Sequence, residues 1–191
     1  MTATTASVTP LDGLWPRTAG SNALRTATLI FVGTGLLALS AHIQIPFWPV
    51  KLSLQTFVVL AIGVAYGSRL GGATTLGYLI EGALGLPVFQ SGAGIAYMMG
   101  PTGGFLLGFV LAAVIIGYCT ERGMLNRFPT AIAALLLAEA AIYIPGVAWL
   151  AAIFGPAKGI AFGLTPFLTG EALKVGLVLT LVPSIRRAVQ S

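Results

Sequence analysis

Six long apolar segments dominate the sequence and decide what the chain can fold into. They fall at about residues 26–44, 53–67, 70–88, 103–120, 129–154 and 159–183. Only 8% of the 191 residues are charged, whereas roughly a quarter are charged in a typical soluble domain. Because a helix of about 20 apolar residues crosses the hydrocarbon layer of a bilayer, we expect an all-α integral membrane protein with six transmembrane helices.

The sequence before the first apolar segment is rich in Thr and Ala and lacks a long apolar run. It predicts a cytoplasmic N-terminal tail over residues 1–24, followed by a single six-helix membrane domain over residues 25–191. Arg17 and Arg25 resemble the basic region of a signal peptide, but the apolar run that follows is long enough to span and has no convincing cleavage site. We therefore interpret that run as the first transmembrane helix.

Basic residues predict the orientation of the six helices. With six spans, one side of the membrane receives most of the basic residues: Arg17, Arg25, Arg69, Arg122, Arg127, Arg186 and Arg187. The opposite side receives Lys51 and Lys158. Because Lys and Arg are enriched in cytoplasmic loops, both termini are predicted to be cytoplasmic. The formal charge of +5 is explained by this orientation, and nucleic acid is not an expected partner.

Two irregular segments, residues 45–51 and 89–102, fall on the predicted external side. The second is long for so small a protein and mixes glycine with aromatic and polar residues. Long ordered loops often have functional roles. We expect residues 89–102 to form a lid over a cavity that opens outward, with a flexible connector as the alternative.

Four ionisable residues lie within the apolar segments: Glu81, Glu139, Glu171 and Lys174. Since a charged side chain costs about 3 kcal/mol at the centre of a bilayer, each should face protein or a polar cavity. Glu171 and Lys174 are three residues apart and share one helix face. They either neutralise each other or hold a polar ligand, because a carboxylate accepts from N–H donors and an ammonium binds carboxylate or carbonyl oxygens.

The other polar candidates allow more than one interpretation. Glu81 either lines the same cavity or is a carboxylic acid kept neutral by burial. Glu139 is either a neutral, hydrogen-bonded acid or part of a proton relay. His42 and Cys119 lack the companion His and Cys residues of a metal site, so we expect an interfacial histidine and a packed thiol.

No nucleotide-binding or hydrolase motif is present: Walker A, His-Glu-x-x-His, Gly-x-Ser-x-Gly and Cys-x-x-Cys are all missing from the sequence. We therefore predict a binding protein rather than an enzyme, with no cofactor.

Three stretches together resemble the BioY family of biotin transporters, which are substrate-binding S components of energy-coupling-factor systems. They are Pro49–Thr56 (PVKLSLQT), Gly82–Phe105, which contains GALGLPVF and GPTGGF, and the pattern Gly170-Glu171-x-x-Lys174. The resemblance extends over nearly the whole chain from about residue 25. It implies a six-helix fold that holds biotin beneath its external loops, and biotin uptake across the bacterial cytoplasmic (inner) membrane.

The resemblance also implies which residues contact the ligand. In the family, the acid and the lysine of the last span do so, matching Glu171 and Lys174, and the loop before Gly-Pro-Thr-Gly-Gly contributes as well. The acid is commonly Asp, and some relatives have a basic residue where this chain has Leu106. We expect Glu171 to accept from a ligand N–H or to order Lys174, and Lys174 to meet a ligand oxygen. The further expected substrate-binding residues are Trp48, Tyr97 and Phe105 as walls, Gln55 and Gln90 as amide partners, and Glu81.

The resemblance implies partners too: a transmembrane coupling subunit and two ATPase subunits. Ala23 and Ala27 begin the first span with the small-x-x-x-small spacing that lets helices approach closely, and they are a candidate docking surface. The family also contains members thought to transport without this module, as oligomers, so a homo-oligomer is the alternative.

Three rival functions stay open at this point. An S component for another vitamin would share the fold but would need different loop chemistry. A small membrane enzyme would use Glu139 and Glu171 as acid and base, but no nucleophile or metal set accompanies them. A proton-coupled secondary carrier would need a proton gradient for uptake.

Overall fold

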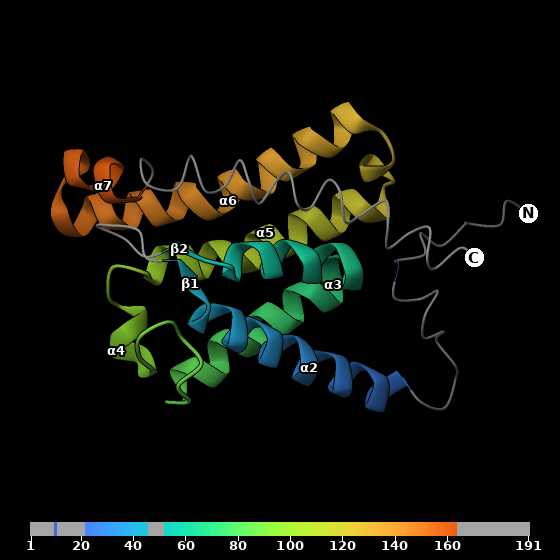
Figure 1. Cartoon of the computed structure of the whole chain (residues 1–191), viewed down its shortest axis with the longest axis horizontal. Helices are drawn as coiled ribbons and strands as arrows, with labels where there is room; N and C mark the ends of the chain where they lie inside the picture. Colours follow the sequence, from blue (N-terminus) through green and yellow to red (C-terminus); the bar gives the residue numbers. More distant parts are fainter. Residues whose placement is uncertain (1–9, 11–21, 46–51, 164–191) are drawn as a thin grey trace, which may run out of the picture.

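The structure, a computed structural model, describes residue 10 and residues 22–45 and 52–163. Helices dominate this part of the chain (Figure 1). The long helices are α2 (Asn22–His42), α3 (Gln55–Ala83), α5 (Gly103–Glu121) and α6 (Phe128–Phe154). Shorter elements connect them: the antiparallel strands β1 (Gln44–Ile45) and β2 (Leu52–Ser53), helix α4 (Gly94–Met98), a 3₁₀ turn (Met124–Asn126) and helix α7 (Pro156–Gly163).

The four long helices of the described part are each long and apolar enough to cross a membrane. Large apolar side chains are exposed along them, among them Phe31 on α2, Leu111 on α5 and Ile144 on α6. An apolar surface of this extent is expected where a protein faces lipid. The all-helical, multi-pass character predicted from the apolar segments is therefore confirmed.

Helix α3 folds back on itself at Gly67, whose φ of 81° and ψ of 177° belong to a backbone region that is essentially restricted to glycine. A Cβ atom added to Gly71 would lie 3.1 Å from the Cα atom of Gly63. The two halves of α3 are thus in backbone contact and form a helical hairpin. Two of the apolar segments expected from the sequence, residues 53–67 and 70–88, correspond to these two halves.

Helix α5 packs against the turn of this hairpin. A side chain at Gly117 of α5 would overlap the backbone at Gly67 and Ser68. The carboxylate of Glu121 then accepts hydrogen bonds from the backbone N–H of Ser68 (2.7 Å) and from its hydroxyl (2.9 and 3.0 Å). Hydrogen bonds to a charged acceptor are stronger than neutral ones, so the end of α5 is fastened to the hairpin turn.

Helices α6 and α7 complete the described part. A Cβ atom on Gly108 of α5 would lie 2.7 Å from the Cα atom of Ile142, so α5 and α6 are also in close backbone contact. Helix α7 packs back onto α6, because a Cβ atom on Gly159 would lie 2.7 Å from the backbone nitrogen of Ala151. The expected last span, residues 159–183, lies outside the described residues beyond Gly163. Helix α4, α7 and the two strands gather toward one end of the bundle, at the left of Figure 1.

The contact between α5 and the hairpin generates a prediction. The substitution Gly117→Ala should lower the free energy of unfolding by about 1–3 kcal/mol, because the methyl group meets backbone atoms that cannot rotate away. The chain's single cysteine, Cys119, is buried, so a thiol-reactive fluorophore reports unfolding in detergent.

The matched control for this measurement is Gly35→Ala. A Cβ atom on Gly35 of α2 would have nothing within 4 Å, and alanine favours the helix by about 1 kcal/mol over glycine. Gly35→Ala should therefore melt at or above the temperature of the unmodified protein. Equal melting temperatures for the two variants would contradict the close contact.

Candidate functional site

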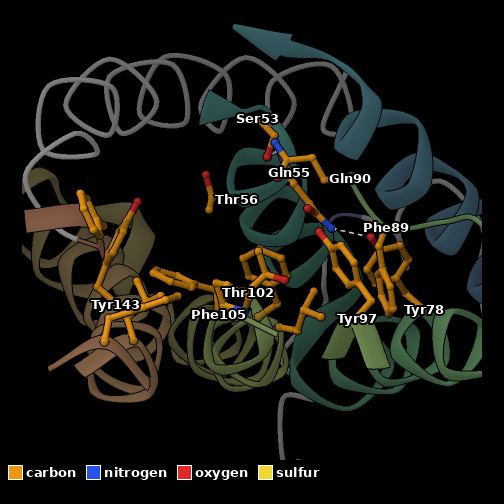
Figure 2. Close-up of a pocket in the computed structure, with 16 residues that line it drawn as sticks. Ser53, Gln55, Thr56, Tyr78, Phe89, Gln90, Tyr97, Thr102, Phe105 and Tyr143 are labelled. Carbon is orange, nitrogen blue, oxygen red and sulfur yellow. Dashed lines mark hydrogen bonds between the residues drawn. The ribbon is translucent and has the colours of Figure 1, made fainter. Parts of the chain in front are cut away.

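A cavity of about 320 Å³ lies where the beginnings of α3 and α5, the second half of α6 and the segment before α5 meet. Its walls are largely aromatic and aliphatic, with a few amide and hydroxyl groups. Figure 2 shows Ser53, Gln55 and Thr56 on one side of the cavity and Phe105 on the opposite side. None of the described residues that line it is charged. Such a cavity suits a mostly apolar ligand that has a few hydrogen-bonding groups.

A chain of hydrogen bonds forms one wall of the cavity. Gln55, at the first turn of α3, donates from its side-chain nitrogen Nε2 to the hydroxyl of Tyr78 (2.7 Å). Tyr78 donates in turn to the backbone carbonyl of Val88 (2.9 Å). Because Gln55 and Tyr78 lie on the two halves of α3 at nearly equal distances from Gly67, the hairpin brings them together. The wall therefore depends on the turn at Gly67.

An aromatic cluster lies next to this hydrogen-bond chain. The ring of Phe89 stacks on Tyr97, with ring centres 5.1 Å apart, and meets Tyr78 edge to face at 5.4 Å. Phe89 is fully buried, and the missing side chain of Gly82 leaves the space for its ring. Aromatic pairs of this geometry contribute beyond the area that they bury. Phe89 thus anchors the segment that follows α3 to the cavity wall.

The segment that was expected to be an external lid, residues 89–102, is packed against the bundle and contains helix α4. Trp149 of α6 donates from its indole nitrogen to the carbonyl oxygen of Gly100 (2.9 Å). Gln44, in β1, donates to the carbonyl oxygen of Gln90 (3.1 Å). These contacts attach one end of the segment to α6 and the other to β1, so in this structure residues 89–102 form a cover beside the cavity. That this cover acts as a lid stays a prediction.

The side chain of Gln90 provides an available donor at the cavity wall. Its amide nitrogen is buried and has no hydrogen-bond partner among the residues that the structure describes. A buried N–H without a partner is costly, so a ligand acceptor at this point would be favourable.

On the opposite wall the ring of Phe105 lies against Gly146 and meets Tyr143 edge to face, with ring centres 6.0 Å apart.

Four of the residues expected from the sequence converge on this cavity: Gln55, Gln90, Tyr97 and Phe105. Glu81 does not line it. It lies on α3 just under one turn beyond Tyr78 and is partly buried. Trp48, Glu171 and Lys174 lie outside the described residues.

Several lining residues were missed by the sequence reasoning, among them Tyr78, Phe89 and Tyr143. Phe89 belongs to the GALGLPVF stretch, which was a usable signal. Tyr78 precedes Glu81 by three residues and so shares its helix face, but no local pattern distinguishes it. Tyr143 sits in an alanine- and leucine-rich run that gives no signal at all.

The remaining polar candidates lie away from the cavity. Glu139 is buried within α6 and does not line it. The ring of His42 is exposed at the end of α2 and lies 2.8 Å from the carbonyl oxygen of Ala38. Within the described ranges, no group of three His, Cys, Asp or Glu side chains is close enough to hold a metal ion.

Comparisons with known proteins point to one family. A sequence model described as the BioY family matches residues 9–191. The chain is 34% identical over 163 residues to "Probable biotin transporter BioY" of Pyrococcus horikoshii, covering 85% of this chain and 96% of that one. It is 35% identical over 144 residues to "Biotin transporter BioY" of Thermotoga maritima, covering 74% of this chain and 84% of that one.

The fold is also similar to a solved structure. A crystal structure described as the S-component for biotin from an ECF-type ABC transporter superposes with a TM-score of 0.75. The match covers 90% of this chain and 95% of that chain at 22% sequence identity. At this level of identity the likeness concerns the fold.

The contact between Trp149 and Gly100 generates a prediction about the cover. Trp149→Phe keeps a ring beside Gly103 and Gly104 but removes the N–H donor, a net loss of about 1 kcal/mol, or roughly a fivefold change in the opening equilibrium. Amide hydrogen exchange over residues 91–100 should accelerate by about that factor. Exchange over residues 122–127, at the far end of α5, is the internal control and should not change. Equal protection of residues 91–100 in both proteins would show that the bond does not hold the cover.

Proposed function

Because the chain belongs to the BioY family, we propose that it binds biotin in this cavity and takes it up across the cytoplasmic membrane. The observation that supports the proposal best is the family match over residues 9–191. Relatives that align over most of their length are described as biotin transporters. The chain is a multi-pass membrane protein with a cavity of suitable size, so binding and uptake can reside in one domain.

The chemistry of biotin fits the described part of the cavity. Biotin has a compact fused ring with an apolar thioether edge, two ureido N–H donors, one ureido carbonyl and a valerate carboxylate. Small-molecule sites are mostly apolar pockets of roughly 300–1,000 Å³ with a few placed polar groups, and this cavity measures about 320 Å³. We assign the ring to the aromatic walls at Tyr97 and Phe105, and the ureido group to the amides of Gln55 and Gln90.

The valerate carboxylate needs a cationic or strongly donating partner, because an unpaired carboxylate is costly to desolvate. The described residues that line the cavity are all neutral. The sequence offers one basic residue within its last apolar segment, Lys174, with Glu171 three positions before it. We therefore propose that Lys174 meets a biotin oxygen, that Glu171 accepts from a ligand N–H or orders Lys174, and that Trp48 adds a further wall.

We also propose six membrane crossings with both termini in the cytoplasm. Helix α2, the two halves of α3, α5 and α6 would supply five crossings, and residues 159–183 would supply the sixth. The hairpin at Gly67 supports this count, because its two halves run in opposite directions. Residues 25–191 would then form one membrane domain behind a cytoplasmic tail, residues 1–24.

For energy coupling we propose a separate transmembrane coupling subunit and two ATPase subunits, since the chain has no nucleotide-binding motif of its own. Ala23 and Ala27 are both exposed on α2, as a surface for close helix docking requires. A homo-oligomer that transports without this module is the alternative.

Ligand identity is tested by competition. Purified protein in detergent should bind radiolabelled biotin, and an excess of unlabelled biotin should displace the label while thiamine and riboflavin should not. The basis is the proposed pairing of the ureido group with the amides of Gln55 and Gln90, which both line the cavity. Displacement by thiamine or riboflavin would indicate an S component for another vitamin, and a strict requirement for a proton gradient in uptake would indicate a secondary carrier.

The charged pair is tested by isothermal titration. Lys174→Ala and Glu171→Ala should each weaken biotin binding about ten- to a hundredfold, because hydrogen bonds to charged groups contribute about 1.5–3 kcal/mol. Lys158→Ala is the matched control, since Lys158 is exposed on α7 and does not line the cavity. Unchanged affinity in both test variants would remove the pair from the site.

A further inference from the structure

The orientation of one amide decides which ligand atom can occupy one side of the cavity. A glutamine side chain presents a donor, its NH₂ group, on one edge and an acceptor, its carbonyl oxygen, on the other. The two edges can exchange places by a half-turn of the amide. Gln55 lines the cavity and is 5% exposed, so the edge that faces the ligand depends on what holds the opposite edge.

Tyr78 holds that opposite edge. The tyrosine hydroxyl has a single proton, and the carbonyl oxygen of Val88, 2.9 Å away, has none to give. Tyr78 must therefore donate to Val88 and can only accept at its other contact. The atom of Gln55 that lies 2.7 Å from the hydroxyl is thus required to be the donating nitrogen. The count of protons on Tyr78 and Val88 by itself fixes this orientation of the Gln55 amide.

The remaining edge of Gln55 is its carbonyl oxygen, which accepts no hydrogen bond from a residue of the described part. The dashed line in Figure 2 runs from the Gln55 nitrogen toward Tyr78 and Phe89, and the oxygen lies on the other side. Tyr78 itself is 0% exposed. Its hydroxyl is engaged by Gln55 and Val88, so we expect its polar effect on a ligand to pass through Gln55.

We propose that Tyr78 is a positioning residue that fixes Gln55 with its carbonyl oxygen toward the ligand, so that the site selects an N–H donor at this point. Gln90 supplies the opposite polarity, because its buried amide nitrogen has no partner among the described residues and can donate to a ligand carbonyl. An acceptor and a donor on one side of the cavity match the N–H and C=O of a cyclic urea. The inference rests on the proposed function, in which the ligand is biotin.

The test uses biotin and two cyclic carbamate analogues, each with one ureido N–H replaced by a ring oxygen and the valerate chain unchanged. Equilibrium binding is measured for the full chain in detergent. One analogue places an oxygen against the Gln55 oxygen, and the unmodified protein should bind it at least about tenfold more weakly than biotin. In Tyr78→Phe the amide is free to turn its NH₂ edge to the ring oxygen. The ratio of the two dissociation constants, that of this analogue divided by that of biotin, should therefore fall by about fivefold.

Controls separate this role from a general loss of structure. Tyr66→Phe makes the same change in α3 at a residue that does not line the cavity, and it should leave the ratio unchanged. Adding Tyr78→Phe to Gln55→Ala should not change the ratio of dissociation constants any further, because the Gln55 amide that Tyr78 positions is then missing. Equal weakening of biotin and both analogues by Tyr78→Phe would overturn the proposal, since a structural role predicts that result.

If Tyr78→Phe does not fold, two substitutions of Gln55 test the proposal instead. Gln55→Glu has an oxygen on both edges and should keep the preference for biotin over the carbamate, whereas Gln55→Ala should lose it. A preference that survives Gln55→Ala would overturn the proposal. If the unmodified protein binds neither biotin nor the analogues, the proposed function fails, and the inference built on it fails as well.

Discussion

Backbone contact at glycines is the constraint on which the rest of this structure depends. Lipid offers apolar side chains as good an environment as another helix does, so helices in a membrane associate through close packing. Here the contacts lie at Gly63 with Ala113, at Gly71 with Gly63, and at Gly108 with Ile142. These positions bring the first half of α3 and α6 against α5, and the second half of α3 against the first. The cavity lies at the ends of the two α3 halves that are far from the turn at Gly67, and aromatic side chains make up much of its lining.

The hydrogen bonds also differ between the end of the bundle at the hairpin turn and the end at the cavity. At the hairpin turn the carboxylate of Glu121 accepts hydrogen bonds from the N–H and the hydroxyl of Ser68, so the end of α5 is bound to the turn. At the other end the polar groups are only half satisfied. Gln55 has a partner for its nitrogen, while the amide nitrogen of Gln90 has none among the described residues. An apolar protein interior keeps such groups at a cost, and a ligand that pairs with them recovers that cost.

The sequence predicted the helices well because hydrophobic length is a local property. Residues 103–120 and 129–154 match α5 and α6 to within a few residues. Two further segments became one element, α3, because only Gly67 departs from helical geometry and the helix resumes directly after it. Helix α4 was not expected, since five residues are too few to show a period.

The site was predicted in part, and the omissions have a common cause. Gln55, Gln90, Tyr97 and Phe105 were found through a family resemblance, while Glu81 was chosen for its charge and lies outside the lining. Tyr78 and Trp149 act through partners 23 and 49 residues away, and such pairings arise only when helices pack. The carbonyl of Val88 accepts from Tyr78, and the neighbouring Phe89 stacks on Tyr97 of the cover. The polarity of this cavity wall and the position of the cover therefore both depend on the segment Val88–Phe89, so a change in one is expected to disturb the other.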